Sequence, residues 1–309
     1  MTSDFIEGNN EVRYGRTYID SVEIYNCSQY DTYKAAVRFE GAEGAWNSIT
    51  NSALHHGLGI GLDIQVSSNV VFANNDIFDF VRFGINIQTS NNISIDNNWV
   101  HGIFSRHLSA KGMGDPVGGI LGCAHKIGDK CNAVRITNNI VSTIEYSGVD
   151  SFCYSVMGHQ CGNYRDIVFK DNVAHSSAGY GAIIFKNSSW GGGYDQCIEA
   201  SYFTAYKCSK VGIVSNQAVH NVFFNNMVLI DNGISAIASV GIEGDIQTSN
   251  MNNIKFYGES EAKDCKVKGH CAFPNNADWE GCQSKAALYP SSFANHKKPP
   301  VIDTKTLWP

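Results

Sequence analysis

Three stretches of the chain carry nearly the same five residues: Val71-Phe-Ala-Asn-Asn, Ser94-Ile-Asp-Asn-Asn and Arg135-Ile-Thr-Asn-Asn. Working outward from them, the pattern also fits Glu23-Ile-Tyr-Asn-Cys, Ser48-Ile-Thr-Asn-Ser, Val168-Phe-Lys-Asp-Asn and Val222-Phe-Phe-Asn-Asn. The first polar residue of each turn then falls at Asn26, Asn51, Asn74, Asn97, Asn138, Asp171 and Asn225. Subtracting these numbers gives steps of 25, 23 and 23 residues, followed by steps of 41 and 33 that contain insertions.

This period predicts an all-β fold, a right-handed single-stranded parallel β-helix or solenoid, with disulfide-pinned loop insertions and an irregular C-terminal tail. One coil cannot bury its own apolar face, but coils stacked about 4.8 Å apart close a continuous core. Asn suits the turn because it tolerates left-handed backbone angles and its side chain can bond along the stack. A leucine-rich repeat would need Leu-rich consensus positions and helical returns, and neither occurs.

The repeat sets the expected domain boundaries. Residues 1–258 are predicted to form the β-helix, with about nine coils, and residues 198–202 mark a degenerate coil before Asn225. Beyond residue 258 the pattern ends. Residues 259–309 are therefore expected to form a Cys-containing tail that packs on the helix or caps its open edge, where strands would otherwise pair with another chain.

Composition excludes several classes of protein. The chain has 309 residues, is 43% hydrophobic and carries a formal net charge of −6. That apolar content excludes disorder, and the acidic balance argues against binding nucleic acid. No apolar run reaches the roughly 20 residues of a membrane span, and the N-terminus lacks the pattern of a signal peptide. We therefore expect a segment of a longer protein, with no membrane span of its own.

The ten cysteines indicate disulfides and an extracellular or cell-surface location. Short spacings suggest the pairs Cys123/Cys131, Cys153/Cys161 and Cys197/Cys208, while Cys265 and Cys271 are expected to bond in the tail, with the pairing among Cys27, Cys265, Cys271 and Cys282 left open. Glycosylation acceptors occur at Asn26, Asn92 and Asn187. No Cys or Cys/His spacing indicates a metal site, and no motif indicates a cofactor.

Three insertions, at about 101–133, 150–165 and 186–196, lie in successive coils and are expected to form one ridge. Candidate binding residues there are Trp190, Tyr194, Lys111 and Arg165. If the ridge were catalytic, the acid or base would come from His101, Arg106, His107 or His159. Alternatively, the loops are disulfide-bridged surface structure whose charged side chains are merely solvated.

Catalytic signatures of other β-helix enzymes are missing. The adjacent Asp motifs of a pectin-type hydrolase do not occur, and the acidic residues are too scattered for a calcium-dependent lyase. The dipeptide His55-His56, near Asp63 in the sequence, is the other group with catalytic residue types. Since it follows a turn, a hydrogen-bonding role is expected. The sequence therefore favours a protein that is not an enzyme, or, if it is one, a glycoside hydrolase or polysaccharide lyase.

An ordered series of segments resembles the β-helix region of fibrocystin and fibrocystin-L. It begins with Gly15-Arg-Thr-Tyr-Ile-Asp-Ser-Val-Glu-Ile-Tyr-Asn-Cys and continues through Asn75-Asp-Ile-Phe-Asp-Phe-Val-Arg-Phe-Gly-Ile and Asn139-Ile-Val-Ser-Thr-Ile-Glu-Tyr-Ser-Gly-Val to about residue 235. The resemblance implies a rigid ectodomain module of a large surface protein, associated in some members with cilia. It also implies a link to proteins of hyaluronan breakdown.

Two hypotheses follow. The first is a non-catalytic structural and interaction module whose partners are other protein chains of an extracellular or ciliary-surface assembly. The second is a glycan-active module, either cleaving a hyaluronan-type polysaccharide or binding glycans through the ridge. Only the second predicts two convergent ionisable groups in a groove.

Overall fold

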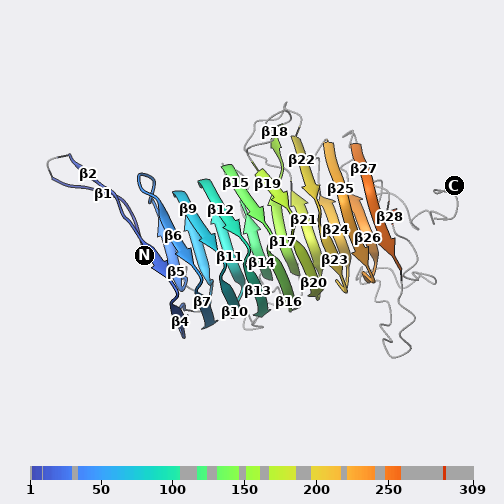
Figure 1. Cartoon of the computed structure of the whole chain (residues 1–309), viewed down its shortest axis with the longest axis horizontal. Coiled ribbons are helices and arrows are strands. Elements are labelled where there is room, and N and C mark those ends of the chain that lie inside the picture. The colour runs from blue at the N-terminus through green and yellow to red at the C-terminus, as the bar shows by residue number, and fades with distance from the viewer. Residues whose placement is uncertain are drawn as a thin grey trace, which may run out of the picture.

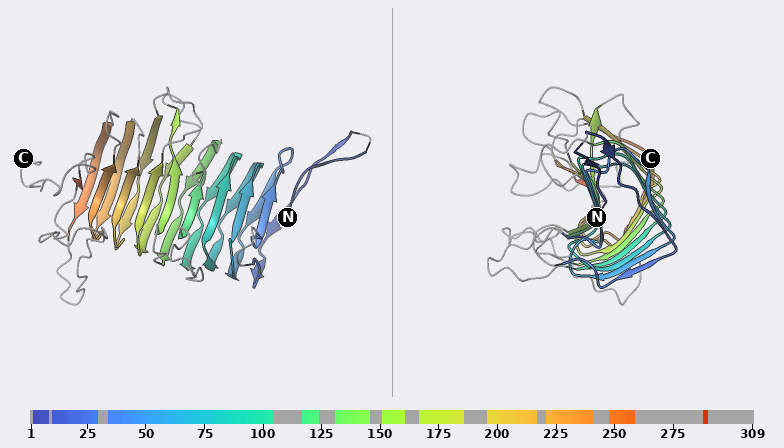
Figure 2. Two further views of the ribbon diagram at one scale, coloured as in Figure 1. Left: turned by 180° about the vertical axis from the view of Figure 1, so that it is seen from behind. Right: turned by 90° about the vertical axis from the view of Figure 1, so that its left-hand side faces the viewer.

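A computed structural model describes residues 2–8, 10–29, 34–104, 117–123, 131–145, 151–160, 167–185, 196–216, 221–240, 248–258 and 288–289. These residues form strands and turns and no helix, so none of them belongs to a helix that could cross a membrane. The strands stack into an elongated parallel solenoid (Figure 1). Viewed along the rod, the strands of successive turns superimpose (Figure 2). The predicted parallel β-helix is therefore confirmed.

Each turn contributes one strand to each of three faces. The first face contains β3 (Tyr18–Asp20), β6 (Asn47–Thr50), β9 (Ser68–Ala73), β12 (Asn91–Asp96), β15 (Asn132–Thr137), β19 (Ile167–Lys170) and β22 (Gln196–Ser201). The second contains β4 (Glu23–Tyr25), β7 (Ala53–Gly57), β10 (Asp76–Val81), β13 (Trp99–Phe104), β16 (Ile140–Ile144), β20 (Val173–Ser177) and β23 (Thr204–Tyr206). The long strands β25 (Asn221–Ile230) and β27 (Thr248–Tyr257) run through both faces.

The third face is a separate sheet of nine strands. In chain order these are β5 (Val37–Glu40), β8 (Leu62–Gln65), β11 (Phe83–Gln88), β14 (Val117–Gly122), β17 (Ser151–Met157), β21 (Tyr180–Phe185), β24 (Val211–Asn216), β26 (Ser235–Val240) and β28 (Leu288–Tyr289). Strand β28 lies within the predicted tail and pairs in parallel with β26. That part of the tail therefore extends the stack, and the division at residue 258 stays a prediction.

Two antiparallel elements depart from the stack. Strands β1 (Phe5–Ile6) and β2 (Val12–Arg13) form a hairpin that projects beyond the first turn (Figure 1). Strand β18 (His159–Gln160) pairs with the start of β22.

The predicted column of corners exists, with two corrections. Nine residues with φ between 50° and 57° stand at the corner between the first and second faces: Ser21, Asn51, Asn74, Asn97, Asn138, Asp171, Tyr202, Asn226 and Asn253. Tyr202 occupies the degenerate turn, as expected. Asn26 is not in this column; it lies one corner later, where its backbone N–H donates to the carbonyl of His55. Asn225 is the last residue before the corner, which is formed by Asn226.

A second column, of buried asparagines, runs inside the corner. The backbone N–H of Asn75 donates to Oδ1 of Asn98 at 2.9 Å, Asn98 donates to Asn139 at 3.0 Å, and Asn139 donates to Asn172 at 3.0 Å. These bonds join residues 23, 41 and 33 positions apart. This asparagine ladder keeps its geometry although the number of residues per turn nearly doubles, so the insertions leave the stack undisturbed.

Candidate functional site

Most breaks in the described chain after residue 29 lie next to the nine-stranded sheet. Residues 105–116 and 146–150 precede β14 and β17, and the breaks at 124–130 and 186–195 follow β14 and β21. The break at 161–166 instead lies between β18 and β19. The corner between the first and second faces, by contrast, is continuous in every turn. Most of the insertions are therefore attached at the ends of the strands of one sheet.

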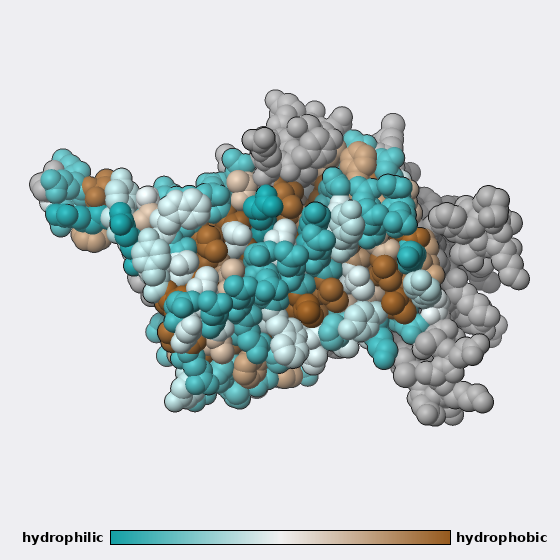
Figure 3. Space-filling view, in the orientation of Figure 1, coloured by the Kyte–Doolittle hydropathy of each residue, from teal (hydrophilic) through white to brown (hydrophobic). Residues whose placement is uncertain are grey.

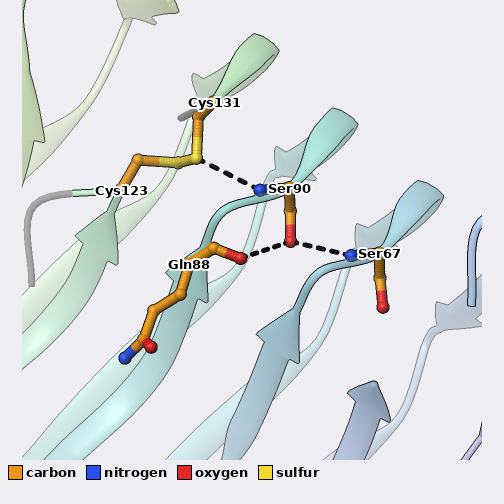
Figure 4. Close-up of a disulfide and its surroundings, with 5 residues drawn as sticks. All are labelled: Ser67, Gln88, Ser90, Cys123 and Cys131. Atoms are coloured by element: carbon orange, nitrogen blue, oxygen red, sulfur yellow. Dashed lines mark hydrogen bonds between the residues drawn. A yellow bond between two sulfur atoms is a disulfide. The ribbon is translucent and has the colours of Figure 1, made fainter. Parts of the chain in front are cut away.

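A disulfide joins the two stems of one insertion (Figure 4). In the regular turn before it, Gln88 ends β11 and Ser90 begins the next face, with one residue between them. Cys123 follows β14 in register with Gln88, and Cys131 takes the place of Ser90, since its Sγ accepts the backbone N–H of Ser90 just as Ser90 Oγ accepts that of Ser67.

The bond holds these stems at the spacing of a regular turn. The Cα atoms of Cys123 and Cys131 are 6.2 Å apart, close to the roughly 7 Å that two residues of extended chain span. Seven residues, 124–130, therefore connect two stem positions that a single residue, Thr89, connects in the regular turn. The predicted Cys123/Cys131 pair is confirmed.

Two other predicted pairs are wrong. Cys153 and Cys208 are buried free thiols, so neither Cys153/Cys161 nor Cys197/Cys208 forms. Cys153 lies on β17 and faces the core beside the Cys208 thiol, where burial raises its pKa well above the usual value. Cys197 is disulfide-bonded, but to none of the other described cysteines. Cys161, Cys265, Cys271 and Cys282 lie outside the described residues, and Cys27 is a partly exposed free thiol.

The histidines whose side chains are described, His55, His56, His101 and His175, all lie on the second face. Four rings stand in one column across β4, β7, β10 and β13: Tyr25, His55, Phe78 and His101. The His55 and Phe78 rings are 4.6 Å apart and nearly parallel, and His101 follows Phe78 at 5.2 Å. The column resumes with His175 and Tyr206, whose rings are 4.6 Å apart.

We call this column of stacked rings the histidine ladder, and carboxylates accept hydrogen bonds from two of its histidines. Nε2 of His55 donates to Glu23 Oε1 at 2.8 Å, and Nε2 of His101 donates to Asp76 Oδ1 at 3.2 Å. The stacked rings cover one another's faces and turn their edges outward. The ladder thus differs from a sugar-binding platform, which needs an exposed ring face.

Asp63 is not part of this cluster. It lies on β8 in the nine-stranded sheet, fully buried, and accepts hydrogen bonds from Asn86 Nδ2 at 2.8 Å and Gln65 Nε2 at 2.9 Å. Burial raises the pKa of Asp63, an effect that the two hydrogen bonds and Arg38 oppose. His56, next to His55, pairs instead with Asp79 at 3.3 Å.

The structure tests few of the predicted site residues. His101 is described and paired with Asp76, whereas His159 is described only by its backbone, which pairs with Cys197. The other ridge candidates lie outside the described residues: Arg106, His107, Lys111, Arg165, Trp190 and Tyr194. Among the glycosylation acceptors, Asn26 and Asn92 are exposed, and Asn187 is also outside.

Sequence reasoning missed the ladder, although the repeat contains a signal for it. Each ring stands four residues after the corner of its turn, as His55 follows Asn51 and His101 follows Asn97. Alignment on the corner residues brings these positions into one column. No third His, Cys, Asp or Glu joins any such group into a metal cluster within the described ranges.

Comparison with known proteins agrees with this geometry. A family model described as a right-handed beta helix region matches residues 6–190. The chain belongs to this right-handed beta-helix family. No curated protein and no solved structure matches it.

Proposed function

We propose that this chain is a non-catalytic structural and interaction module, a stiff β-helix that displays loops from a larger extracellular surface protein. The observation that carries the proposal is the unbroken asparagine ladder, whose bonds stay at 2.9–3.0 Å across turns of 23, 41 and 33 residues. A fold that tolerates insertions without shifting its core can present variable loops at fixed positions.

The placement of the insertions supports the same proposal. Most of them adjoin the strand ends of a single sheet, and the Cys123–Cys131 bond keeps one of them on stems with regular spacing. Fixing the ends of a loop reduces the entropy that it loses when it binds a partner. On the face shown in Figure 3, polar side chains divide the apolar surface into small patches. Recognition through the displayed loops is therefore more consistent with the structure than recognition through a broad hydrophobic surface on this face.

The parent protein is proposed to be of the fibrocystin and fibrocystin-L kind. The ordered resemblance over about residues 12–235 supports this origin. An extracellular or ciliary-surface location is supported by the Cys123–Cys131 disulfide and by the exposed acceptors Asn26 and Asn92. Other protein chains of such an assembly are the proposed partners.

A turn graft tests the display role. Residues 123–131 are replaced by Gln-Thr-Ser, the sequence of residues 88–90, which restores a regular turn and removes the disulfide. We expect unchanged far-UV circular dichroism and a Tm within about 2 °C of the parent, which corresponds to roughly 1 kcal/mol for a chain of this size. Loss of the β-sheet signal would show that the insertion is structural and would contradict the proposal.

A glycan-cleaving module is the second candidate, favoured by the two His–carboxylate pairs at His55 and His101 on an accessible face. The purified chain is incubated with hyaluronan and other glycosaminoglycans, and the products are sized. The display proposal expects no shortening. Shortening that His101→Phe abolishes, while the protein stays folded, would establish the second candidate instead.

A further inference from the structure

Two adjacent imidazoles face each other on the second face of the rod. Nδ1 of His55 lies 2.5 Å from Nδ1 of His56. Nε2 of His55 donates to Oε1 of Glu23 at 2.8 Å, and Nε2 of His56 lies 3.3 Å from Oδ2 of Asp79, an ion-pair contact without hydrogen-bond geometry. The four side chains form a line from carboxylate to carboxylate.

The carboxylate of Glu23 determines which nitrogen of His55 carries the proton. An ionised carboxylate only accepts hydrogen bonds, and Glu23 is well exposed to solvent. Nε2 of His55 must therefore carry its hydrogen, which leaves its Nδ1 with a lone pair directed at Nδ1 of His56. The two Nδ1 atoms can share one proton in a hydrogen bond or, once that proton is displaced, one metal ion.

We propose that His55 and His56 bind one transition-metal ion through their Nδ1 atoms. Metal-binding histidines usually donate their other ring N–H to a carboxylate, which fixes the tautomer and raises ligand basicity. Glu23 supplies this outer partner for His55, and the carboxylate of Asp79 lies 3.3 Å from Nε2 of His56. Imidazole nitrogens favour copper, nickel and zinc over calcium or magnesium.

The local packing allows the small movement that a metal requires. Metal–nitrogen bonds of about 2.1 Å at a tetrahedral angle would place the two nitrogens roughly 3.4 Å apart. His55 is held in place by the rings of Tyr25 and Phe78. The His56 side chain is half exposed, at the corner between the second face and the nine-stranded sheet, and can swing outward by about 1 Å. Water fills the remaining positions, because no third protein ligand stands among the described residues.

Untagged, EDTA-stripped protein is titrated with Cu²⁺ and, separately, Zn²⁺ by isothermal calorimetry, with electron paramagnetic resonance of the copper form. The column itself supplies conservative variants. His55→Phe introduces the residue type found at the same position one turn later, in Phe78. His56→Asn introduces the residue type found at the same corner one turn earlier, in Asn26. His101→Phe is the matched control, because His101 stands in the same ladder without a facing imidazole.

We expect one saturable site whose copper spectrum shows nitrogen ligands. It should be lost in His55→Phe and in His56→Asn, retained in His101→Phe, and weakened about 10–100-fold in Glu23→Gln. The proposal is overturned if the parent protein binds neither metal saturably, which is also the result expected if only a proton bridges the rings. Saturable binding that survives in both histidine variants overturns it as well. Thermal unfolding of each variant establishes that a lost site is not a lost fold.

Discussion

Two adjacent asparagines give the sharpest test of what holds the stack together. Asn98 is 2% exposed. Its Oδ1 accepts hydrogen bonds from the backbone N–H of Asn75 at 2.9 Å and from the side-chain Nδ2 of Asn75 at 3.0 Å. Its Nδ2 donates to the carbonyl of Phe72 and to Oδ1 of Asn139, each at 3.0 Å. Asn97, its neighbour, is exposed and makes one side-chain bond, to Asn74 Oδ1.

Asn98→Ala removes the side-chain partner of two buried backbone groups, the N–H of Asn75 and the carbonyl of Phe72, while Nδ2 of Asn75 keeps its bond to the carbonyl of Ile49. Oδ1 of Asn139 keeps one donor, the backbone N–H of residue 98. A buried polar group that loses its partner costs about 1–3 kcal/mol, so the variant should lose at least about 2 kcal/mol of unfolding free energy. Asn97→Gly removes one exposed bond, and glycine adopts its φ of 53° without strain. That change should cost less than about 1 kcal/mol.

Urea unfolding followed by circular dichroism measures the two variants against the parent, as a shift of the midpoint at a constant m-value. Hydrogen exchange at the Asn75 amide adds a local measurement, since that N–H is protected through Asn98. Solenoids can unfold in parts, and the amide signal remains interpretable if they do. Equal stability of Asn98→Ala and Asn97→Gly, or unchanged exchange at Asn75, would refute the view that the buried ladder carries the stack.

Two further predictions concern the Cys123–Cys131 disulfide and His175 in the histidine ladder. Replacing Cys123 and Cys131 by serine should lower the unfolding free energy by about 2.6 kcal/mol, the chain entropy of a loop of this length; an unchanged urea midpoint would mean that the bond adds nothing to a rod that already fixes both stems. Burial lowers the pKa of His175 below its ordinary value of 6.5, so the unfolded chain binds more protons than the folded one as the pH falls below about 6.5, and stability declines. His175→Phe keeps the stack on Tyr206 but removes this titration, so urea midpoints measured from pH 7 to pH 5 should fall less than in the parent; parallel pH profiles would contradict this assignment.

The corners show how far sequence reasoning reached. Asn51, Asn74 and Asn97 were placed correctly because a left-handed corner in a stacked coil strongly favours asparagine, whatever surrounds it. The alignment of the repeat is wrong at the first turn, where Ser21 forms the corner between the first and second faces and Asn26 lies at the following corner. The segment Glu23-Ile-Tyr-Asn-Cys imitates the motif while belonging to the second face. Only pairing with β7 reveals this, because strand register depends on the neighbouring turn.

Cysteine pairing also depended on the tertiary structure, for a related reason. Short spacing was sufficient for Cys123 and Cys131, because their stems replace a single regular turn. It failed for Cys153, because side chains alternate between the two faces of a strand and this one faces the core.

The sequence by itself thus determined the solenoid, its period and the positions of its insertions, since these follow from local backbone preferences repeated along the chain. The tertiary structure decided which side chains share a column and which nitrogen meets which carboxylate. Residues from different turns become neighbours only when the coils stack. The pairs of His55 with Glu23 and of His101 with Asp76, 32 and 25 positions apart, exist only because parallel pairing fixes the register between one turn and another.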